Sequence, residues 1–316
     1  MLVPALSVVL AAVAEVAAAA AVVIGWRVRS ARRIERATAA RLPLGPDGIV
    51  RGAEPIALDG PQPARAVLLL HGFGDTPQTL RYLAEDLHAH GYTVRAPLLP
   101  GHGRTLRDFR ASSAEQWVDA ARDELRALCA RGGSVAIVGL SMGGAIASIL
   151  AAEIADEGGD LPALVLMSPY LDASLVVRRV ARWHHTLGLG TTYLVARGGE
   201  RSVHDEVERA KTLSYRVTTP RLLHELVSLA DRARDALGRI AAPTLIIQSR
   251  EDNRIAPEVA ERAQAALGAR QKRLVWVEGC GHVITVDFGR ERVFALVREW
   301  LGAHMATRAE RHARAR

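Results

Sequence analysis

The sequence predicts an α/β domain with a mostly parallel central sheet and helices on both of its faces. Short apolar runs alternate along the chain with segments of helical spacing, a pattern typical of parallel strands joined by crossover helices. The runs are continuously apolar, as expected of strands that are covered on both faces. The expected strands span residues 66–70, 93–99, 134–140, 163–167, 244–248 and 274–277, with a leading strand or hairpin within 49–58. The expected helices span residues 79–89, 114–130, 145–155, 258–267 and 292–301.

One long region interrupts this alternation. Residues 170–240 carry helical patterns and no convincing strand, and they are too many for a simple connection inside a compact sheet. We therefore expect a helical cap inserted between two strands of a main domain that spans residues 49–303. Apolar side chains in the cap, such as Trp183, Tyr193 and Leu226, could form one wall of a pocket or could serve only to pack the cap on the body.

The first 26 residues are almost free of charge and predict a transmembrane anchor. From Leu2 to Trp26 the charged side chain is Glu15, and 25 helical residues at ~1.5 Å each would cross a hydrocarbon core of ~30 Å. A cleaved signal peptide is the alternative, because the alanines of 17–21 offer cleavage sites, but no basic residue precedes the apolar run. Arginines follow the segment, so the positive-inside rule places the chain after Arg27 on the cytoplasmic side.

Two basic segments flank the main domain: a predicted juxtamembrane linker at 27–48 and a predicted tail at 304–316. Lysine and arginine total 41 against 34 acidic residues, which gives a net charge of +7. The basic runs contain no interleaved aromatic residues, so the sequence does not indicate nucleic-acid binding. The linker arginines could contact anionic lipid headgroups. Cys129 and Cys280 are too few for a disulfide framework and lack the neighbours of a zinc site.

The clearest chemical motif surrounds Ser141. It is the central residue of Gly139-Leu140-Ser141-Met142-Gly143, which follows an apolar strand and precedes a helical pattern. A G-x-S-x-G sequence in this setting forms a tight turn that exposes a strained serine, and the glycines relieve clashes around it. Ser141 is therefore the candidate nucleophile, which needs a neighbouring base oriented by a third group.

Two later strand ends supply candidates for that base and that acid. Residues 244–248 lead into Glu251 and Asp252, and residues 274–277 lead into a glycine-flanked loop that contains His282. The order serine, acid, histidine is the one used by serine hydrolases with this strand-turn-helix motif. We expect Asp252 to orient the His282 ring and His282 to act as base, with Glu251 as the rival acid.

The tetrahedral intermediate of such a reaction needs donors for its oxyanion. The strand at 66–70 opens into His71-Gly72-Phe73-Gly74, a turn that could aim a backbone amide at the site. The amides of Phe73 and Met142 are the candidates. His71 and His102 are expected to be structural.

These motifs together resemble the α/β-hydrolase superfamily, and within it the carboxylesterase and monoacylglycerol lipase branch, which is serine aminopeptidase-like. The matching segments are HGFG at 71–74, PGHG at 100–103, GLSMGG at 139–144, QSRED at 248–252 and GCGHVITVD at 279–287. The resemblance implies an α/β-hydrolase fold with a cap, the triad Ser141, Asp252 and His282, and oxyanion amides at Phe73 and Met142. Ser249 departs from the family, which often has glycine before the acid.

The expected function is a membrane-anchored serine esterase or lipase that acts on apolar acyl esters through an acyl-enzyme. Monoacylglycerols and lysophospholipids are candidate substrates. Membrane lipid is also an expected binding partner. No metal or organic cofactor is required, and no obligate protein partner is evident. An acyltransferase, a thioesterase, a haloperoxidase-like or C–C bond hydrolase and a non-catalytic membrane-tethered binding module are the alternatives.

Overall fold

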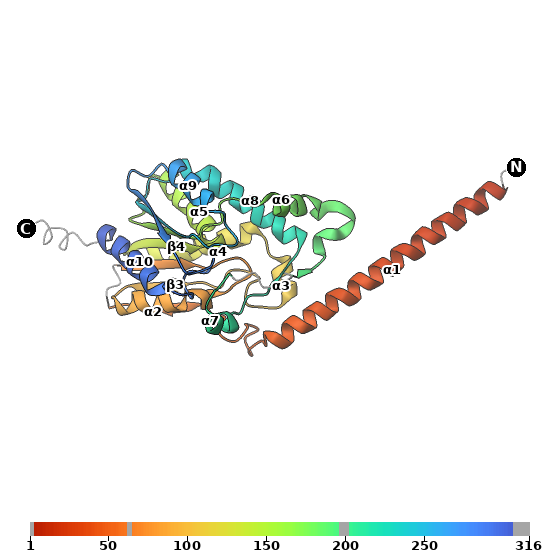
Figure 1. Cartoon of the computed structure of the whole chain (residues 1–316), viewed down its shortest axis with the longest axis horizontal. Coiled ribbons are helices and arrows are strands. Elements are labelled where there is room, and N and C mark those ends of the chain that lie inside the picture. The colour runs from red at the N-terminus through yellow and green to blue at the C-terminus, as the bar shows by residue number, and fades with distance from the viewer. Residues whose placement is uncertain (1–2, 62–64, 196–201, 306–316) are drawn as a thin grey trace, which may run out of the picture.

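The computed structural model describes residues 3–61, 65–195 and 202–305, and within these ranges the side chains of 3–10, 12, 13 and 186–189 are not described (Figure 1). Its centre is a seven-stranded sheet in the order β1-β3-β2-β4-β5-β8-β9. β1 pairs with β3 in antiparallel fashion, and the other neighbours are parallel. The strands are β1 (Ile56–Leu58), β2 (Arg65–Leu70), β3 (Thr93–Ala96), β4 (Ser134–Leu140), β5 (Leu164–Met167), β8 (Thr244–Ser249) and β9 (Lys272–Val277).

Helices cover both faces of this sheet and bury two apolar cores (Figure 1). Successive strand residues point to opposite faces, so Leu68 and Ile137 join one core while Val67 and Val138 join the other. The first core is closed by α4 (Ala114–Cys129), α5 (Met142–Asp156), α8 (Pro220–Ala236) and α9 (Pro257–Ala266). The second is closed by α2 (Arg81–Ala89) and α10 (Arg290–His304). The continuous apolar runs of the sequence follow from this two-sided burial.

The expected strands from residue 66 onward are confirmed, with β3 ending at Ala96 instead of residue 99. The leading segment 49–58 is mostly irregular, and it forms β1 and one isolated bridge between Leu44 and Val50. Two short helical elements, α3 (Leu106–Ala111) and η1 (Pro77–Leu80), accompany the expected helices. α3 begins at a capping box in which Thr105 and Asp108 bond each other's backbone amides.

The predicted cap lies between β5 and β8. It contains α6 (Leu175–Arg182), η2 (Trp183–Thr191), α7 (Glu206–Lys211), η3 (Leu237–Arg239) and α8, and residues 196–201 lie outside the described part. The expectation of a purely helical cap was wrong. β6 (Leu194–Val195) pairs antiparallel with β7 (Val217–Thr218), and strands this short carry no periodic signal in the sequence.

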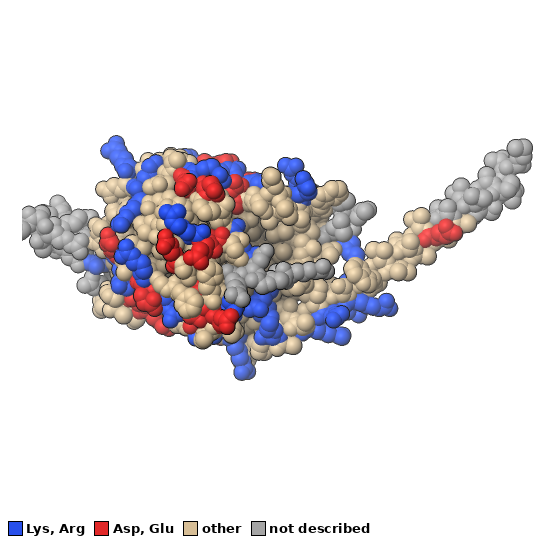
Figure 2. Space-filling view, viewed as in Figure 1, with Lys and Arg blue, Asp and Glu red and all other residues tan. Residues whose placement is uncertain are grey.

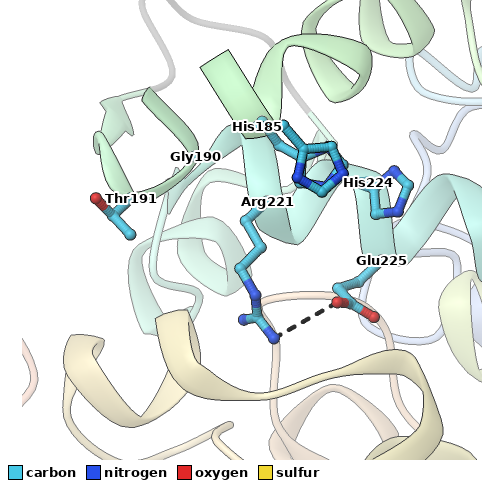
Figure 3. Close-up of a pocket in the computed structure, with 7 residues that line it drawn as sticks. His185, Gly190, Thr191, Arg221, His224 and Glu225 are labelled. Carbon is cyan, nitrogen blue, oxygen red and sulfur yellow. Dashed lines mark ion pairs between the residues drawn. The ribbon is translucent and has the colours of Figure 1, made fainter. Parts of the chain in front are cut away.

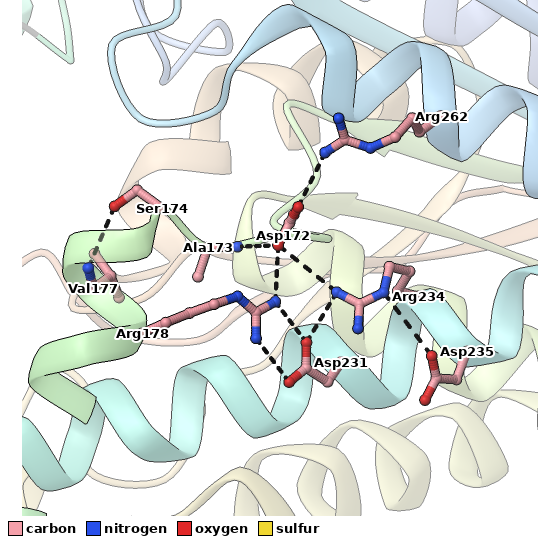
Figure 4. A network of polar contacts seen from close by, with 9 residues as sticks. All are labelled: Asp172, Ala173, Ser174, Val177, Arg178, Asp231, Arg234, Asp235 and Arg262. Atoms are coloured by element: carbon pink, nitrogen blue, oxygen red, sulfur yellow. Dashed lines mark hydrogen bonds and ion pairs between the residues drawn. The ribbon is translucent and has the colours of Figure 1, made fainter. Parts of the chain in front are cut away.

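A polar network ties the cap to the body beside the end of β5 (Figure 4). Asp172 accepts hydrogen bonds from Arg178 of α6 at 2.8 Å and from Arg262 of α9 at 3.0 Å. Arg178 also binds Asp231 of α8 through two hydrogen bonds. These groups are partly exposed, so each pair adds little alone, but together they set where α6 and α8 lie.

The N-terminal helix α1 (Val3–Arg41) is one continuous element that projects from the body (Figure 1). It runs through most of the segment expected to be a linker, because alanine and arginine are strong helix formers. Its C-terminal half contacts the cap and α3: Arg27 donates to the Thr192 hydroxyl at 2.7 Å, and Glu35 accepts from Arg107 and from the Tyr193 hydroxyl. Basic side chains gather on the half of α1 nearest the body (Figure 2).

No helix in the described part of the chain is both long enough and apolar enough to cross a membrane. The predicted transmembrane helix at 1–26 is therefore not supported. Part of that segment, residues 1–2 and the side chains of 3–10, 12 and 13, lies outside the described residues, as does most of the predicted basic tail, from residue 306 onward.

Candidate active site

Ser141 lies at the junction of β4 and α5, in the middle of the parallel sheet. Its backbone has φ 55° and ψ −116°, which few residues other than glycine adopt. The Ser141 amide donates to the Met167 carbonyl at 2.9 Å, and its carbonyl accepts from the amides of Gly144 and Tyr170. These bonds hold the strained turn in place, as expected of a backbone whose strain is stored at a functional site.

The glycines beside the serine are required by close backbone contacts. A Cβ added at Gly143 would lie 2.1 Å from the Leu70 carbonyl oxygen, and one at Gly139 would lie 2.3 Å from the Gly143 oxygen. The partner atoms are backbone of β2 and of the turn itself, which cannot move aside cheaply. The two glycines of the motif therefore allow β2, β4 and α5 to meet behind Ser141.

Replacement of Gly143 by alanine is expected to destabilise the protein by roughly 3 kcal/mol or more, because the new methyl group overlaps Leu70 backbone. The urea midpoint of unfolding measures this loss. Gly302→Ala in α10 is the matched control, since nothing lies within 4 Å of its added Cβ and alanine favours helix. Equal midpoints for both variants would contradict the role assigned to the close contact.

His282 and Asp252 complete a hydrogen-bonded chain with Ser141. The His282 Nε2 lies 2.8 Å from the Ser141 Oγ, and its Nδ1 lies 2.7 Å from Asp252 Oδ2. Ser141 is 8% exposed and His282 is 7% exposed, so both are largely shielded from bulk water. The structure thus brings together the three residues that the sequence singled out, from the ends of β4, β8 and β9.

Asp252 is held as a carboxylate. Burial alone raises its pKa, but the His282 ring and the backbone amides of Ile255 and Arg254 outweigh that effect and lower the pKa below its usual value. Those amides donate to Oδ1 at 2.9 and 2.7 Å, and the Gln248 amide donates to Oδ2 at 2.8 Å. An ionised, fixed Asp252 can orient the His282 ring and stabilise its protonated form.

The rival acid, Glu251, points elsewhere. Its Oε1 accepts from the Gly279 amide at 2.7 Å, and its Oε2 lies 3.6 Å from His204 Nδ1. Glu251 therefore supports the loop that carries His282 and does not touch the ring.

Two supporting residues were not identified from the sequence. The Ser249 hydroxyl donates to the Cys280 carbonyl and accepts from the Glu251 amide, so the residue that departs from the family pattern joins the acid loop to the histidine loop. Asp287 accepts from the amides of Gly281 and His204 and fixes the other side of that loop. Most of these hydrogen bonds join segments that are distant in sequence, so no local pattern predicts them.

The predicted oxyanion donors lie beside the serine. Met142 is the first residue of α5, so its amide has no acceptor within the helix. The turn that carries Phe73 lies against Ser141, because a Cβ on Gly72 would lie 3.4 Å from the Ser141 Cβ. The Phe73 ring packs against Phe109 and Trp117 at centroid distances of 5.1 and 5.9 Å, which fixes the turn.

The structural roles expected of His71 and His102 are confirmed. The His71 Nδ1 donates to the Gly72 carbonyl and its Nε2 accepts from the Leu99 amide, which requires the neutral ring. Burial lowers the pKa of His71 to about 4, against the opposing effect of the Gly72 bond. His102 is also fully buried, and its Nδ1 lies 3.1 Å from the Pro100 carbonyl.

The cap carries a separate cavity of about 420 Å³ (Figure 3). The His184 ring lies against the tilted ring of His185 and stacks on His224, with centroid distances of 3.6 and 3.9 Å, and Arg221 faces Glu225. Ser141 is not among its lining residues. Within the described residues no group of His, Cys, Asp and Glu is arranged to hold a metal ion.

Comparison with known proteins supports this reading of the motifs. The sequence matches the family model Hydrolase_4, described as serine aminopeptidase S33, over residues 61–288. A thermostable monoacylglycerol lipase from Bacillus sp. (strain H-257) is 30% identical over 257 residues, 81% of this chain and 97% of the relative. A carboxylesterase from Bacillus subtilis (strain 168) is 28% identical over 239 residues, 75% of this chain and 92% of the relative.

A solved structure from work on two metagenome-derived lipolytic enzymes, LipS and LipT, superposes with a TM-score of 0.73. It is 30% identical in sequence, and the match covers 81% of this chain and all of the other. The architecture is therefore an α/β-hydrolase fold, as the motifs indicated.

Proposed function

Given that the chain belongs to the serine aminopeptidase S33 family, we propose that it is a serine hydrolase that cleaves carboxylic esters of apolar acids, with monoacylglycerols as the substrate class. The observation that carries the proposal is the hydrogen-bonded chain from Ser141 through His282 to Asp252. The names of the lipase and carboxylesterase relatives support an ester as the substrate.

The geometry supports an acyl-enzyme mechanism. Ser141 Oγ attacks the ester carbonyl while His282 Nε2 takes its proton, and the oxyanion forms beside the Phe73 and Met142 amides. His282 then gives that proton to the departing alcohol. In the second half of the cycle His282 activates a water that releases the acid from Ser141. Asp252 keeps the His282 ring oriented throughout.

The test is release of fatty acid by the full-length chain from 1-monoacylglycerols of increasing acyl length. A lysophospholipid, an acyl thioester and a short alkyl ester serve as competing substrates, and an added alcohol acceptor reveals acyl transfer. Preferred release of acid from monoacylglycerols supports the proposal. Faster thioester cleavage or an acylated acceptor as the main product favours the alternatives, and an inert, folded chain favours a binding module.

We further propose that the protein works at a lipid surface, on the cytoplasmic side of a membrane. Support comes from apolar side chains of α1 that are between 54% and 72% exposed, namely Val16, Val22, Val23, Ile24 and Trp26. They lie next to the arginines that begin at Arg27, and such a combination favours burial at an anionic lipid interface.

The double substitution Val22→Ser and Trp26→Ser is expected to reduce flotation of the full-length chain with vesicles that contain anionic lipid. Hydrolysis of a soluble ester should remain unchanged, because neither side chain touches the site. Val207→Ser in α7 is the control, since Val207 is 65% exposed but lies in the cap and not on α1. Undiminished flotation of the double variant would argue against α1 as the contacting surface.

A further inference from the structure

Gln248 is a polar side chain that lies fully buried near the end of β8. It directly follows the apolar residues 245–247 of that strand, and none of its surface is exposed. Burial of an amide costs free energy unless its polar atoms find hydrogen-bond partners. Methionine, which has a similar length and volume, would fill the same interior without that cost. The contacts of the Gln248 amide must therefore offset the cost of burying it.

The two ends of this amide are unequally satisfied. Nε2 donates to Asp252 Oδ2 at 2.8 Å and to the Ser249 carbonyl at 3.4 Å. An ionised carboxylate can only accept, so the amide must present its NH₂ group to Asp252. Oε1 is shut off from solvent and accepts no hydrogen bond from any residue in the described part of the chain. The contact with Asp252 is thus kept despite the cost of an unpaired acceptor.

The donor acts on the carboxylate oxygen that matters for catalysis. Oδ2 is also the atom that lies 2.7 Å from His282 Nδ1, whereas Oδ1 is held by the amides of Arg254 and Ile255. Bonds to Oδ1 alone would let Oδ2 swing away from the ring, and a donor on Oδ2 fixes the second oxygen as well. That donor also stabilises part of the negative charge that Oδ2 presents to the ring.

We propose that Gln248 is a positioning residue that acts through Asp252: it fixes the direction of Oδ2 and offsets part of its charge, so that His282 remains an unprotonated base to lower pH. The inference rests on the proposed ester hydrolysis, in which His282 must be neutral to accept the Ser141 proton. Without Gln248, the full charge of Oδ2 would face Nδ1 and hold the proton on the ring more tightly.

The experiment replaces Gln248 by methionine, which removes the donor and nearly conserves the volume. On a soluble ester, kcat at the pH plateau is expected to fall roughly tenfold while KM changes by less than about twofold. The pH at which kcat/KM reaches half of its plateau should rise by roughly 0.5 to 1 pH unit. The urea midpoint should stay close to wild type, because the unpaired Oε1 disappears together with the hydrogen bond.

Gln248→Glu tests the donor itself at nearly unchanged shape. While the new carboxyl is protonated it can donate to Asp252 Oδ2, so this variant should recover most of the kcat that Gln248→Met loses. Loss of that proton at higher pH places two negative charges side by side. Its kcat should therefore fall again at alkaline pH, where the wild-type chain keeps its plateau.

Thr244→Val is the matched control. Thr244 is also fully buried, and its hydroxyl donates to the Ala242 carbonyl at 2.8 Å, but it lies at the other end of β8. Four residues at ~3.3 Å each separate it from Gln248 by roughly 13 Å. Its replacement should lower the urea midpoint and leave kcat and the pH profile unchanged, as expected of a purely structural hydrogen bond.

Other ionisable groups near the histidine loop stay in place in every variant, so a change in the pH profile reports the contact of Gln248 with Asp252. They come from the turn after β2, the cap, the acid loop and the histidine loop itself: Asp75, His204, Glu251, Arg254 and Asp287.

The pH profile is also recorded from the rate at which a fluorophosphonate labels Ser141, which needs His282 as base but no ester. An acid limb that stays in place or moves to lower pH in Gln248→Met would overturn the inference, even if the urea midpoint fell. A loss of kcat that Gln248→Glu restores at no pH would also overturn it. A wild-type chain that is labelled but hydrolyses no ester would overturn the proposed function, and the labelling profile would still decide the role of Gln248.

Discussion

Replacement of Ser141 by alanine is expected to lower ester hydrolysis by about a millionfold, the scale seen when a triad loses its nucleophile. The Oγ that lies 2.8 Å from His282 is then missing, and no acyl-enzyme can form. Covalent labelling by a fluorophosphonate should disappear in the same variant. Both are measured on the full-length chain, so that the contacts of α1 with the cap are kept.

Ser148→Ala is a suitable control for this experiment. Ser148 is buried in α5, about two turns beyond Ser141, and its hydroxyl donates to the Gly144 carbonyl at 2.8 Å. Its loss should leave hydrolysis and labelling close to wild type. Labelling that persists in Ser141→Ala would assign the nucleophile to another residue.

Replacement of Asp252 by asparagine is expected to lower kcat by about 10⁴-fold with little change in KM. The asparagine NH₂ group could donate to Nδ1, which would hold the His282 ring in the wrong tautomer. The neutral amide would also no longer stabilise protonated His282. Part of the activity should return at high pH, where a deprotonated ring no longer depends on the carboxylate. A pH profile of kcat measures this.

Glu251→Gln is the matched control for Asp252→Asn, because the two acids are adjacent and only Asp252 contacts the ring. The amide oxygen of glutamine can still accept from the Gly279 amide, so activity should change little. If Glu251→Gln were the more damaging of the two, the acid would have to be reassigned.

The parts of the site that the sequence could predict are those set by local chemistry. Ser141 needs a turn with glycines on both sides, and Asp252 and His282 follow apolar strands whose ends must meet in a parallel sheet. The roles of these residues in catalysis stay predictions until the variants above are measured. The structure places their three side chains in one hydrogen-bonded chain.

Features that depend on contacts distant in sequence could not be predicted. Asp287 joins the histidine loop to the cap by accepting from the amides of Gly281 and His204, and nothing local to residue 287 indicates the contact with the cap. β6 and β7 are two residues long each and meet across a segment of the cap, so no periodicity marks them. The helical continuation of α1 to Arg41 escaped prediction because a charged segment next to an apolar one resembles a linker.

The final residue of α1 has a practical consequence for work with shortened chains. Arg41 donates to the carbonyls of Ser214 and Tyr215 at 2.8 and 2.9 Å, and the Tyr215 amide in turn donates to the carbonyl of Gly74, in the turn that carries Phe73. A chain that lacks residues 1–41 would lose the Arg41 hydrogen bonds, which link the N-terminal helix through the cap to the turn. A chain that begins just before Arg27 lacks only the apolar half of α1 and keeps these hydrogen bonds. Kinetic comparison of the two truncations would therefore separate the solubility of the protein from the integrity of its active site.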